Sequence, residues 1–485
     1  MSEENKKMEE HTLKKGEVGL WHGVFQSFSF VAPAGDVAIL LVGTVAFAGE
    51  YTAISVLLAW LIYGLFMITP YEFSKIKANA GSYYAYSAEG AKWLAPIALF
   101  SWMGENLTGP AFSLLGLSGF IFLLSSTLSS IPFLWIVFLI IVGIYMGLLP
   151  YLGIKPSLNY VMYTGFAEAL FLMLSSIIII IKLGSSNTII PFTISIPYIP
   201  AIFFGAIFSI LDFTGLGTVT TISEEIKESK KVVKKALIYA YVLSGISLIL
   251  PAYALTVGWG LSKISSYAIS PDPGLIVFKQ FLGIVGFALL AAFTINSYLS
   301  YSVAKTNADS RIWFSAARDG IILPKWIAYV HPKYKTPSHA IIFWLGLSVI
   351  VSLIFGILFG PVNGGLVLLD MAGVAILSVH IVTNSALSIY KRRSSHHYSI
   401  IEIAKYFLAP SMASILGITI IYFSLQSTIA QVISQPTPLN FAYFGATLGG
   451  VLWCLVGFII SFYYIRKKPD ILAKAGNYDA EGELK

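Results

Sequence analysis

The chain has 485 residues, of which 56% are hydrophobic and only 11% are charged, with a formal net charge of +7. A water-soluble protein of this length could not cover its surface with so few charged side chains. The composition therefore excludes a soluble protein and indicates an all-α, polytopic membrane protein.

Apolar runs divide the chain into a polar stretch at 1–21, a membrane domain at 22–465 and a polar stretch at 466–485. Residues 1–21 mix Lys and Glu without apolar periodicity, which predicts a disordered tail, and the last 20 residues have the same character. Twelve membrane spans are predicted, near 26–46, 53–70, 93–124, 132–149, 158–182, 199–222, 236–260, 275–308, 339–359, 363–389, 404–426 and 440–465.

Basic residues indicate the orientation of these spans. All but four of the 31 Lys and Arg residues fall in the two tails or in even-numbered connections, the exceptions being Lys182, Lys263, Lys279 and Lys305. The positive-inside rule then places both termini in the cytoplasm of a protein in the cell membrane. Basic residues scattered among loops favour contact with anionic lipid over binding of nucleic acid.

The first span contains a predicted interruption at residues 32–36, which read Ala-Pro-Ala-Gly-Asp. Proline removes a backbone donor, and the small residues with Gly35 would let the helix open. Asp36 would then lie near the start of a second half-helix, where free N–H groups favour an anion. An acid inside the bilayer is costly and marks a functional site by default.

The sixth span has its own interruption, in which Asp212 is followed by Gly215 and Gly217. In an inverted five-plus-five repeat, spans 1 and 6 correspond, so paired breaks predict a substrate site near the middle of the membrane. The alternatives are an ordinary proline kink and close packing of glycine-containing helices.

Three further acids, Glu105, Glu168 and Asp370, lie within predicted spans and are costly there unless paired. Burial favours the neutral form of a carboxyl group, so Glu168 is a candidate carrier of a coupling proton. Its alternative role is a hydrogen bond that holds span 5 to span 1 or span 8.

Sodium is the alternative coupling ion. It would need carbonyl oxygens of span 1 and hydroxyl groups of span 8, where Thr294, Ser297 and Ser300 are available. Hydroxyl groups in membrane helices commonly bond to their own backbone instead, so protons are favoured.

Catalytic and metal-binding patterns are missing from the sequence. Cys454 is the only cysteine, which excludes an intrachain disulfide and a thiolate metal cluster, and no HExxH pattern occurs among the seven histidines. His380, within the tenth span, is interpreted as a packing residue rather than a proton carrier. We therefore expect no enzyme activity, no metal site and no cofactor, and the lack of a Walker A motif argues against an ATP-driven pump.

Three stretches resemble signatures of the amino acid–polyamine–organocation superfamily. They are residues 213–227, from Phe-Thr-Gly to Ser-Glu-Glu-Ile-Lys, residues 310–337, which begin SRIWFSAARDG, and residues 80–86, AGSYYAY. The stretch at 310–337 is the most specific of the three, and its alternative interpretation is a basic cytoplasmic loop with a short amphipathic helix. The likeness extends from about residue 22 to 465.

This resemblance implies a leucine-transporter-like fold with 12 transmembrane helices, a 5+5 inverted repeat and discontinuous helices 1 and 6. It implies a secondary transporter of amino acids or related amines that works by alternating access. Proton-coupled symport is the favoured mode, and an amino acid/polyamine exchanger or a non-transporting sensor on the same scaffold is the alternative. A channel is disfavoured because no repeated filter motif is present. The oligomeric state stays open.

The resemblance also implies a substrate site. A substrate carboxylate would meet backbone N–H groups near Ala34, Gly35 and Asp36, and Phe213 holds the position of an aromatic gate. The substrate ammonium group would meet carbonyl groups around Val31, Ala32, Ile210 and Leu211, with Gly215 beside them.

The chain departs from the family pattern at Asp36 and Asp212, where small residues are usual. Two acids would repel a lone α-carboxylate and attract a cation, which favours a cationic amino acid or an amine. Asp36 has the alternative role of capping its half-helix without contacting substrate.

Overall fold

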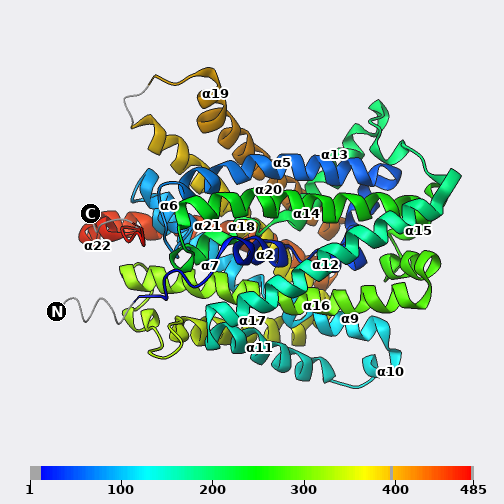
Figure 1. Cartoon of the computed structure of the whole chain (residues 1–485), viewed down its shortest axis with the longest axis horizontal. Coiled ribbons are helices and arrows are strands. Elements are labelled where there is room, and N and C mark those ends of the chain that lie inside the picture. Colours follow the sequence, from blue (N-terminus) through cyan, green and yellow to red (C-terminus); the bar gives the residue numbers. More distant parts are fainter. Residues whose placement is uncertain (1–11, 394–396, 482–485) are drawn as a thin grey trace.

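The computed structural model describes residues 12–393 and 397–481. Within these ranges the regular structure is helical, and the single β-bridge joins Val18 to Ile226. The long helices run roughly side by side (Figure 1). This arrangement suits a membrane, because a helix satisfies its backbone hydrogen bonds within its own segment.

The helices of the first half of the chain are α2 (Leu20–Val31), α3 (Pro33–Gly35), the π-helical turn η1 (Asp36–Leu40), α4 (Leu41–Ala48), α5 (Thr52–Ser74), α6 (Tyr83–Gly90), α7 (Leu94–Thr108), α8 (Ala111–Leu114), α9 (Gly116–Leu124), α10 (Ser126–Ser129), α11 (Leu134–Leu152), α12 (Ile154–Leu183), α13 (Ile199–Ile210), and the 3₁₀ turns η6 (Leu211–Phe213) and η7 (Thr218–Glu225). Those of the second half are α14 (Ser229–Trp259), α15 (Ile264–Tyr267), α16 (Pro273–Asp319), η9 (Lys325–Ala328), α17 (Ser338–Phe359), α18 (Pro361–Arg392), α19 (Ile400–Ile403), η10 (Ala404–Leu408), α20 (Ala409–Ser434), α21 (Pro438–Lys467) and α22 (Pro469–Lys474). Short 3₁₀ turns at Gly49–Tyr51, Gly184–Ser186, Ile190–Phe192, Ile196–Tyr198 and Leu261–Lys263 lie in the connections.

Eleven helical stretches within the described residues are long and apolar enough to cross a membrane. The first, Leu20–Ser74, has 55 residues and includes the predicted spans 26–46 and 53–70. A straight helix of that length would be about 80 Å long, more than twice the thickness of a bilayer core. The counts of eleven and twelve differ because Leu20–Ser74 is one helical stretch where two spans are predicted. The number twelve stays a prediction.

Close helix packing forms the interior, and apolar side chains cover the outside. Helix α18 contacts α6, α7, α20 and α21. A Cβ atom at Gly90 of α6 would lie 2.4 Å from the carbonyl oxygen of Ala386 in α18, so only glycine allows this approach. Ile144 and Ile181 are 64% and 71% exposed, as expected of side chains that face lipid.

Three predicted span boundaries are corrected. Helix α16 continues to Asp319, eleven residues beyond the predicted span 275–308, and α20 continues to Ser434, eight residues beyond the predicted span 404–426. Helix α14 begins seven residues before the predicted span 236–260. Residues 310–319 are therefore the end of a long helix rather than a loop with a separate short helix. The charged side chains there do not need water, because Arg311 and Arg318 have ion-pair partners inside the protein.

The predicted disordered tails are also corrected where the structure describes them, while residues 1–11 and 482–485 lie outside the described part of the chain. Leu13 is buried, and Val18 lies in backbone hydrogen bonds with residues 225 and 227. At the other end, the Ala480 N–H donates to the Ala78 carbonyl at 2.9 Å. Lys15 Nζ donates to the Ala480 carbonyl at 3.2 Å, which joins both ends of the described chain.

These contacts define the terminal face, the end of the molecule at which residues 12–18, 76–82, 223–230 and 475–481 meet. It lies at the left of Figure 1, where α22 is labelled, and the connections around α10 and α15 lie at the opposite end. The described tail residues are held here by contacts with other segments, among them the bonds of Val18 to residues 225 and 227 and the pair of Asp479 with Lys230.

Candidate functional site

The first helix break is centred on Ala32. This residue has φ 57° and ψ 53°, in the left-handed region, and separates α2 from α3. The following Pro33 disfavours an ordinary helical conformation for the residue before it, which accounts for a left-handed alanine at this point. Gly35 has φ −64° and is helical, so the expectation that Gly35 opens the backbone is wrong. A π-helical turn over Asp36–Leu40 follows.

The backbone N–H groups of this break are already engaged. Ala34 N–H donates to Glu168 Oε1 at 2.9 Å. The N–H groups of Gly35 and Asp36 both donate to the Ala32 carbonyl, at 3.0 Å and 3.3 Å. These are the three donors that the family resemblance assigns to a substrate carboxylate, and each has a partner within the protein.

The second break separates α13 from η7. Helix α13 ends at Ile210, the turn η6 follows, and Gly215 has φ 97°. A Cβ atom at Gly215 would lie 2.0 Å from the Phe30 ring, and one at Gly217 would lie 1.9 Å from the Tyr83 hydroxyl. Both glycines are therefore required where the second break packs against the first break and α6.

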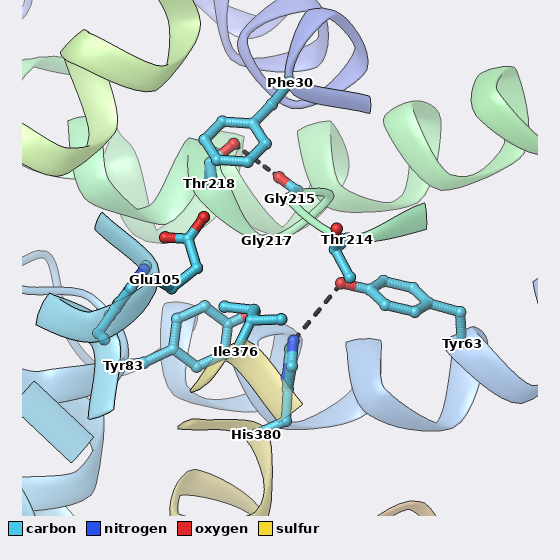
Figure 2. Close-up of a pocket in the computed structure, with 11 residues that line it drawn as sticks. Phe30, Tyr63, Tyr83, Glu105, Thr214, Gly215, Gly217, Thr218, Ile376 and His380 are labelled. Carbon is cyan, nitrogen blue, oxygen red and sulfur yellow. Dashed lines mark hydrogen bonds between the residues drawn. The ribbon is translucent and has the colours of Figure 1, made fainter. Parts of the chain in front are cut away.

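A cavity lies beside the second break, and the first broken helix reaches it through Phe30 (Figure 2). Its walls come from α2, α5, α6, α7, α18 and the second break, and the lining residues are Phe30, Tyr63, Tyr83, Trp102, Glu105, Thr214, Gly215, Gly217, Thr218, Ile376 and His380. Of the ten residues predicted for substrate binding, only Gly215 lines it. The side chains that shape this cavity come mainly from helices that the sequence analysis did not assign to the site.

Four of the eleven lining residues are aromatic, namely Phe30, Tyr63, Tyr83 and Trp102. The Tyr83 and Trp102 rings meet edge to face with centroids 5.0 Å apart. The His380 ring centroid lies 5.1 Å from that of Tyr83, and His380 Nε2 lies 3.5 Å from the Tyr63 hydroxyl. His380 Nδ1 has no hydrogen-bond partner among the described residues. The aromatic neighbours fit the predicted packing role of this histidine, and its position adds a polar atom beside the cavity.

Glu105 brings a carboxyl group to the cavity. In Figure 2 this carboxyl group lies between Phe30 and Tyr83. Its Oε1 accepts a hydrogen bond from Lys305 Nζ at 2.6 Å, and its Oε2 accepts one from the Asn106 amide at 3.1 Å. The sequence shows that Glu105 lies inside a predicted span, but it does not show that Glu105 lies close to the breaks.

The predicted acids Asp36 and Asp212 line a second, smaller cavity. Its other walls are Val37, Leu41, Val56 and Leu248. Asp36 is 4% exposed, and its Oδ2 makes no hydrogen bond with a described residue. The two acids thus line one cavity, and this cavity shares no lining residue with the aromatic cavity.

The remaining predicted residues form the framework of the breaks. Val31, Ala32 and Ile210 are buried, and Leu211 is partly buried and packs beside Gly373 of α18. The Phe213 ring is fully buried, with its centroid 6.3 Å from that of Tyr63. Phe213 therefore contacts a wall of the aromatic cavity from behind.

Glu168 connects three helices. Besides Ala34 N–H, its Oε1 accepts a hydrogen bond from the Ser297 hydroxyl at 2.8 Å, and its Oε2 accepts one from the Asn296 amide at 3.2 Å. The Thr294 hydroxyl donates to the Ala34 carbonyl at 3.3 Å. The three predicted coupling residues therefore lie together, where α12 and α16 meet the first break.

A protein-family model for amino acid permeases matches residues 22–474. The chain belongs to the amino acid permease family. Its relatives include the branched-chain amino acid permease BcaP of Bacillus subtilis (strain 168), 22% identical over 339 residues, or 66% of this chain and 64% of BcaP. The low-affinity putrescine importer PlaP of Escherichia coli (strain K12) is 28% identical over 144 residues, or 28% of this chain and 30% of PlaP. The match thus spans just under two thirds of the first relative and less than one third of the second.

The fold of this permease is shared with solved transporters. Two mutant forms of a manganese transporter from Eremococcus coleocola superpose with a TM-score of 0.55 each. They cover 92% and 93% of this chain, and the matches span 95% and 98% of the transporter, at 12% sequence identity. The fold is the predicted leucine-transporter-like one, in a multi-pass membrane protein. The details of the inverted repeat stay a prediction.

Proposed function

We propose that this protein is a secondary active transporter of amino acids or related amines in the cell membrane, with both termini in the cytoplasm. The observation that carries the proposal is the aromatic cavity between two broken helices. A cavity there lets short half-helices move relative to the long helices, which is what alternating access to a central site requires. The names of BcaP, an amino acid permease, and PlaP, a putrescine importer, support this substrate range.

We further propose that transport is coupled to protons through Glu168. As a carboxylate, Glu168 accepts hydrogen bonds from the first break and from two side chains of α16. Protonation would remove the negative charge that holds these donors together and would weaken the contact of α12 with both elements. The contact between the first break and α16 therefore depends on whether Glu168 carries a proton.

Sodium coupling has less support. A sodium ion would need the oxygens of Ala34, Thr294 and Ser297 as ligands. In this structure those groups are hydrogen-bonded to one another or to Glu168. A sodium ion would have to fit within this network, whereas a proton needs only the carboxyl group that is already there.

The test is uptake by the purified protein in proteoliposomes, with and without an inward proton gradient. The panel contains neutral amino acids, arginine, lysine and putrescine. We expect accumulation of at least one compound that increases as the external pH falls. Uptake that occurs only into vesicles preloaded with a second substrate would favour the exchanger, and binding without transport would favour the sensor.

The first prediction concerns Glu168→Gln. This variant keeps the size and polarity of the side chain but cannot take up a proton, so we expect the pH dependence of uptake to disappear. Asp370→Asn is the matched control, because Asp370 is an acid in α18 that bonds to Ser424 and Thr447 outside both cavities. A Glu168→Gln variant with the pH profile of the wild type would move proton coupling to another group.

A further inference from the structure

Three charged side chains form a cluster behind the aromatic cavity. Lys305 Nζ lies 2.6 Å from Glu105 Oε1 and 2.8 Å from Asp309 Oδ2. Lys305 and Asp309 are fully buried, and Glu105 is 7% exposed. The cluster thus contains two carboxyl groups and one ammonium group. The next basic residue on α16, Arg311, does not correct this imbalance, because it forms an ion pair with Glu225.

Only the acidic side of this cluster reaches the cavity. Glu105 is a lining residue, whereas no Lys or Arg is among the residues that line the cavity. Lys305 lies behind the Phe30 ring, with Nζ 5.1 Å from the ring centroid. The faces of aromatic rings attract cations, so the four aromatic residues of the wall reinforce the preference that Glu105 creates.

A substrate carboxylate has little to bind in the same place. The N–H groups of Ala34, Gly35 and Asp36 are taken by Glu168 and by the Ala32 carbonyl. A carboxylate in the cavity would also face Glu105 without a basic residue beside it in the wall. The cost of burying an unpaired anion therefore acts against amino acids and leaves amines without a carboxylate as the better ligands.

We propose that Glu105, Lys305 and Asp309 form a charge-reading relay in which Lys305, behind the cavity wall, supplies the cation that pairs with Glu105 while the cavity is empty. An amine that enters the cavity binds Glu105, and Lys305 gives up its hydrogen bond to Glu105 and donates instead to Asp309, whose carboxylate oxygens accept no hydrogen bond from a described residue while the cavity is empty. The loaded site then holds two carboxylates and two cations, which removes the excess negative charge. Glu105 contacts the substrate, while Lys305 and Asp309 act as positioning residues.

This inference rests on the proposed function only in using the same cavity, and its test is equilibrium binding rather than transport. The full-length protein in detergent is titrated with pairs that differ only by a carboxylate: putrescine and ornithine, cadaverine and lysine, 3-methylbutylamine and leucine. We expect each amine to bind at least tenfold more tightly than its amino acid. Equal or tighter binding of the amino acids would overturn the relay alone, and failure of all six compounds to bind would overturn the proposed function as well.

Three variants test the individual roles. We expect Glu105→Gln to weaken amine binding at least tenfold, and Asp309→Asn to weaken it several-fold although Asp309 does not line the cavity. The control Asp370→Asn should bind amines as the wild type does. An Asp309→Asn variant with unchanged affinity would refute the relay, because the relay requires a second negative charge that holds Lys305 when the amine binds Glu105.

Lys305→Gln separates the relay from a purely structural role. Without the lysine, two carboxyl groups face each other unpaired, so we expect a lower thermal midpoint in the absence of ligand. An added amine should then raise this midpoint more than it raises that of the wild type, because the ligand supplies the missing cation. A ligand-induced shift no larger than that of the wild type would contradict the proposal even if the variant is unstable.

Discussion

Buried acids that pair with basic residues in this protein do so in two different ways. At the terminal face, each acid has a basic residue of its own. Glu224 receives two hydrogen bonds from Arg318, at 2.8 Å and 3.0 Å, and Glu225 receives two from Arg311, at 2.5 Å and 2.9 Å. Each carboxylate has one arginine in a bidentate arrangement, so the charges balance. Such pairs fix the end of η7 against the end of α16 and leave nothing for a ligand to neutralise.

Beside the aromatic cavity, two acids share one basic residue. There Lys305 is shared between Glu105 and Asp309, and Glu105 still faces open space. A compact ammonium group can move between two acceptors, whereas a planar guanidinium group is held by one. The ratio and geometry of the charges, rather than the presence of buried acids, therefore distinguish a closed contact from a binding site.

The C-terminal segment belongs to the first kind of region. Lys92 Nζ donates to the Ala475 carbonyl at 2.7 Å, and the Gly476 N–H donates to Asp319 at 2.7 Å. The Arg318 guanidinium lies 3.9 Å from the Tyr478 ring centroid, and Lys230 pairs with Asp479 at 2.8 Å. Residues 475–481 thus cover the ion pairs of the terminal face and join the ends of several helices.

The largest expected effect comes from breaking a balanced pair. Arg311→Met leaves Glu225 buried and unpaired, which costs about 3–5 kcal/mol. We expect the thermal midpoint of the purified protein to fall by several degrees or more. Lys231→Gln is the control, since Lys231 and Glu228 form a pair that is 77% and 59% exposed and contributes little.

The double variant Arg311→Met with Glu225→Gln sharpens this prediction. Removing both charges should recover a large part of the lost stability, because no unpaired charge is left inside the protein. A double variant as unstable as the single one would show that packing of the arginine, rather than charge balance, holds this face.

A smaller effect is expected from deleting residues 475–485. The deletion removes hydrogen bonds to Lys92, Asp319 and Lys230, which are only partly buried. We expect the thermal midpoint to fall by a few degrees and trypsin cleavage near Lys75 and Lys77 to become faster. We also expect a two- to threefold increase in uptake rate, because fewer contacts then oppose opening of the terminal face. Deleting residues 482–485 alone keeps these contacts and is the control. Identical behaviour of both deletions would show that residues 475–481 do not stabilise the terminal face.

The smallest effect is expected from Asp212→Asn. The sequence alone predicts that this change weakens binding of cationic substrates far more than of neutral ones. Because Asp212 lines the second cavity, we now expect a loss of only about two- to threefold for amines, compared with tenfold or more for Glu105→Gln. The measurement is the affinity of each variant for amines at one fixed ionic strength. A larger loss of affinity for Asp212→Asn than for Glu105→Gln would place recognition of the substrate charge in the second cavity.

The sequence was most reliable where a residue acts on its own backbone. Pro33 and Gly215 change the chain locally, and both predicted breaks are present. It was wrong about Gly35, because the left-handed conformation falls on Ala32, the residue next to the proline. In the described parts of the tails, several polar residues that the sequence predicts to be disordered make contacts with segments far away in the sequence.

Few contacts between distant segments could be predicted. A hydrogen bond from Glu168 to span 1 or span 8 was one of its two expected roles, and Ala34 N–H and the Ser297 hydroxyl reach Glu168 from these two spans. The contact of Lys305 with Glu105, across 200 residues, was not expected. The acids inside predicted spans were recognised as costly, but nothing in the sequence says which of them meets a cation. Asp36 and Asp212 were assigned to the substrate site because glycines and a proline lie near them in the sequence. Glu105 was not assigned to it, because no predicted helix break lies beside it.

By itself, the sequence determined that the protein lies in a membrane, where its helices break and to which family it is similar, because hydropathy, Pro and Gly act locally. The tertiary structure decided which acids are balanced, which line the aromatic cavity and which donors are left for a substrate. Those properties depend on separations of a few ångströms between helices, and a charge in a membrane interior is stable or reactive according to that separation.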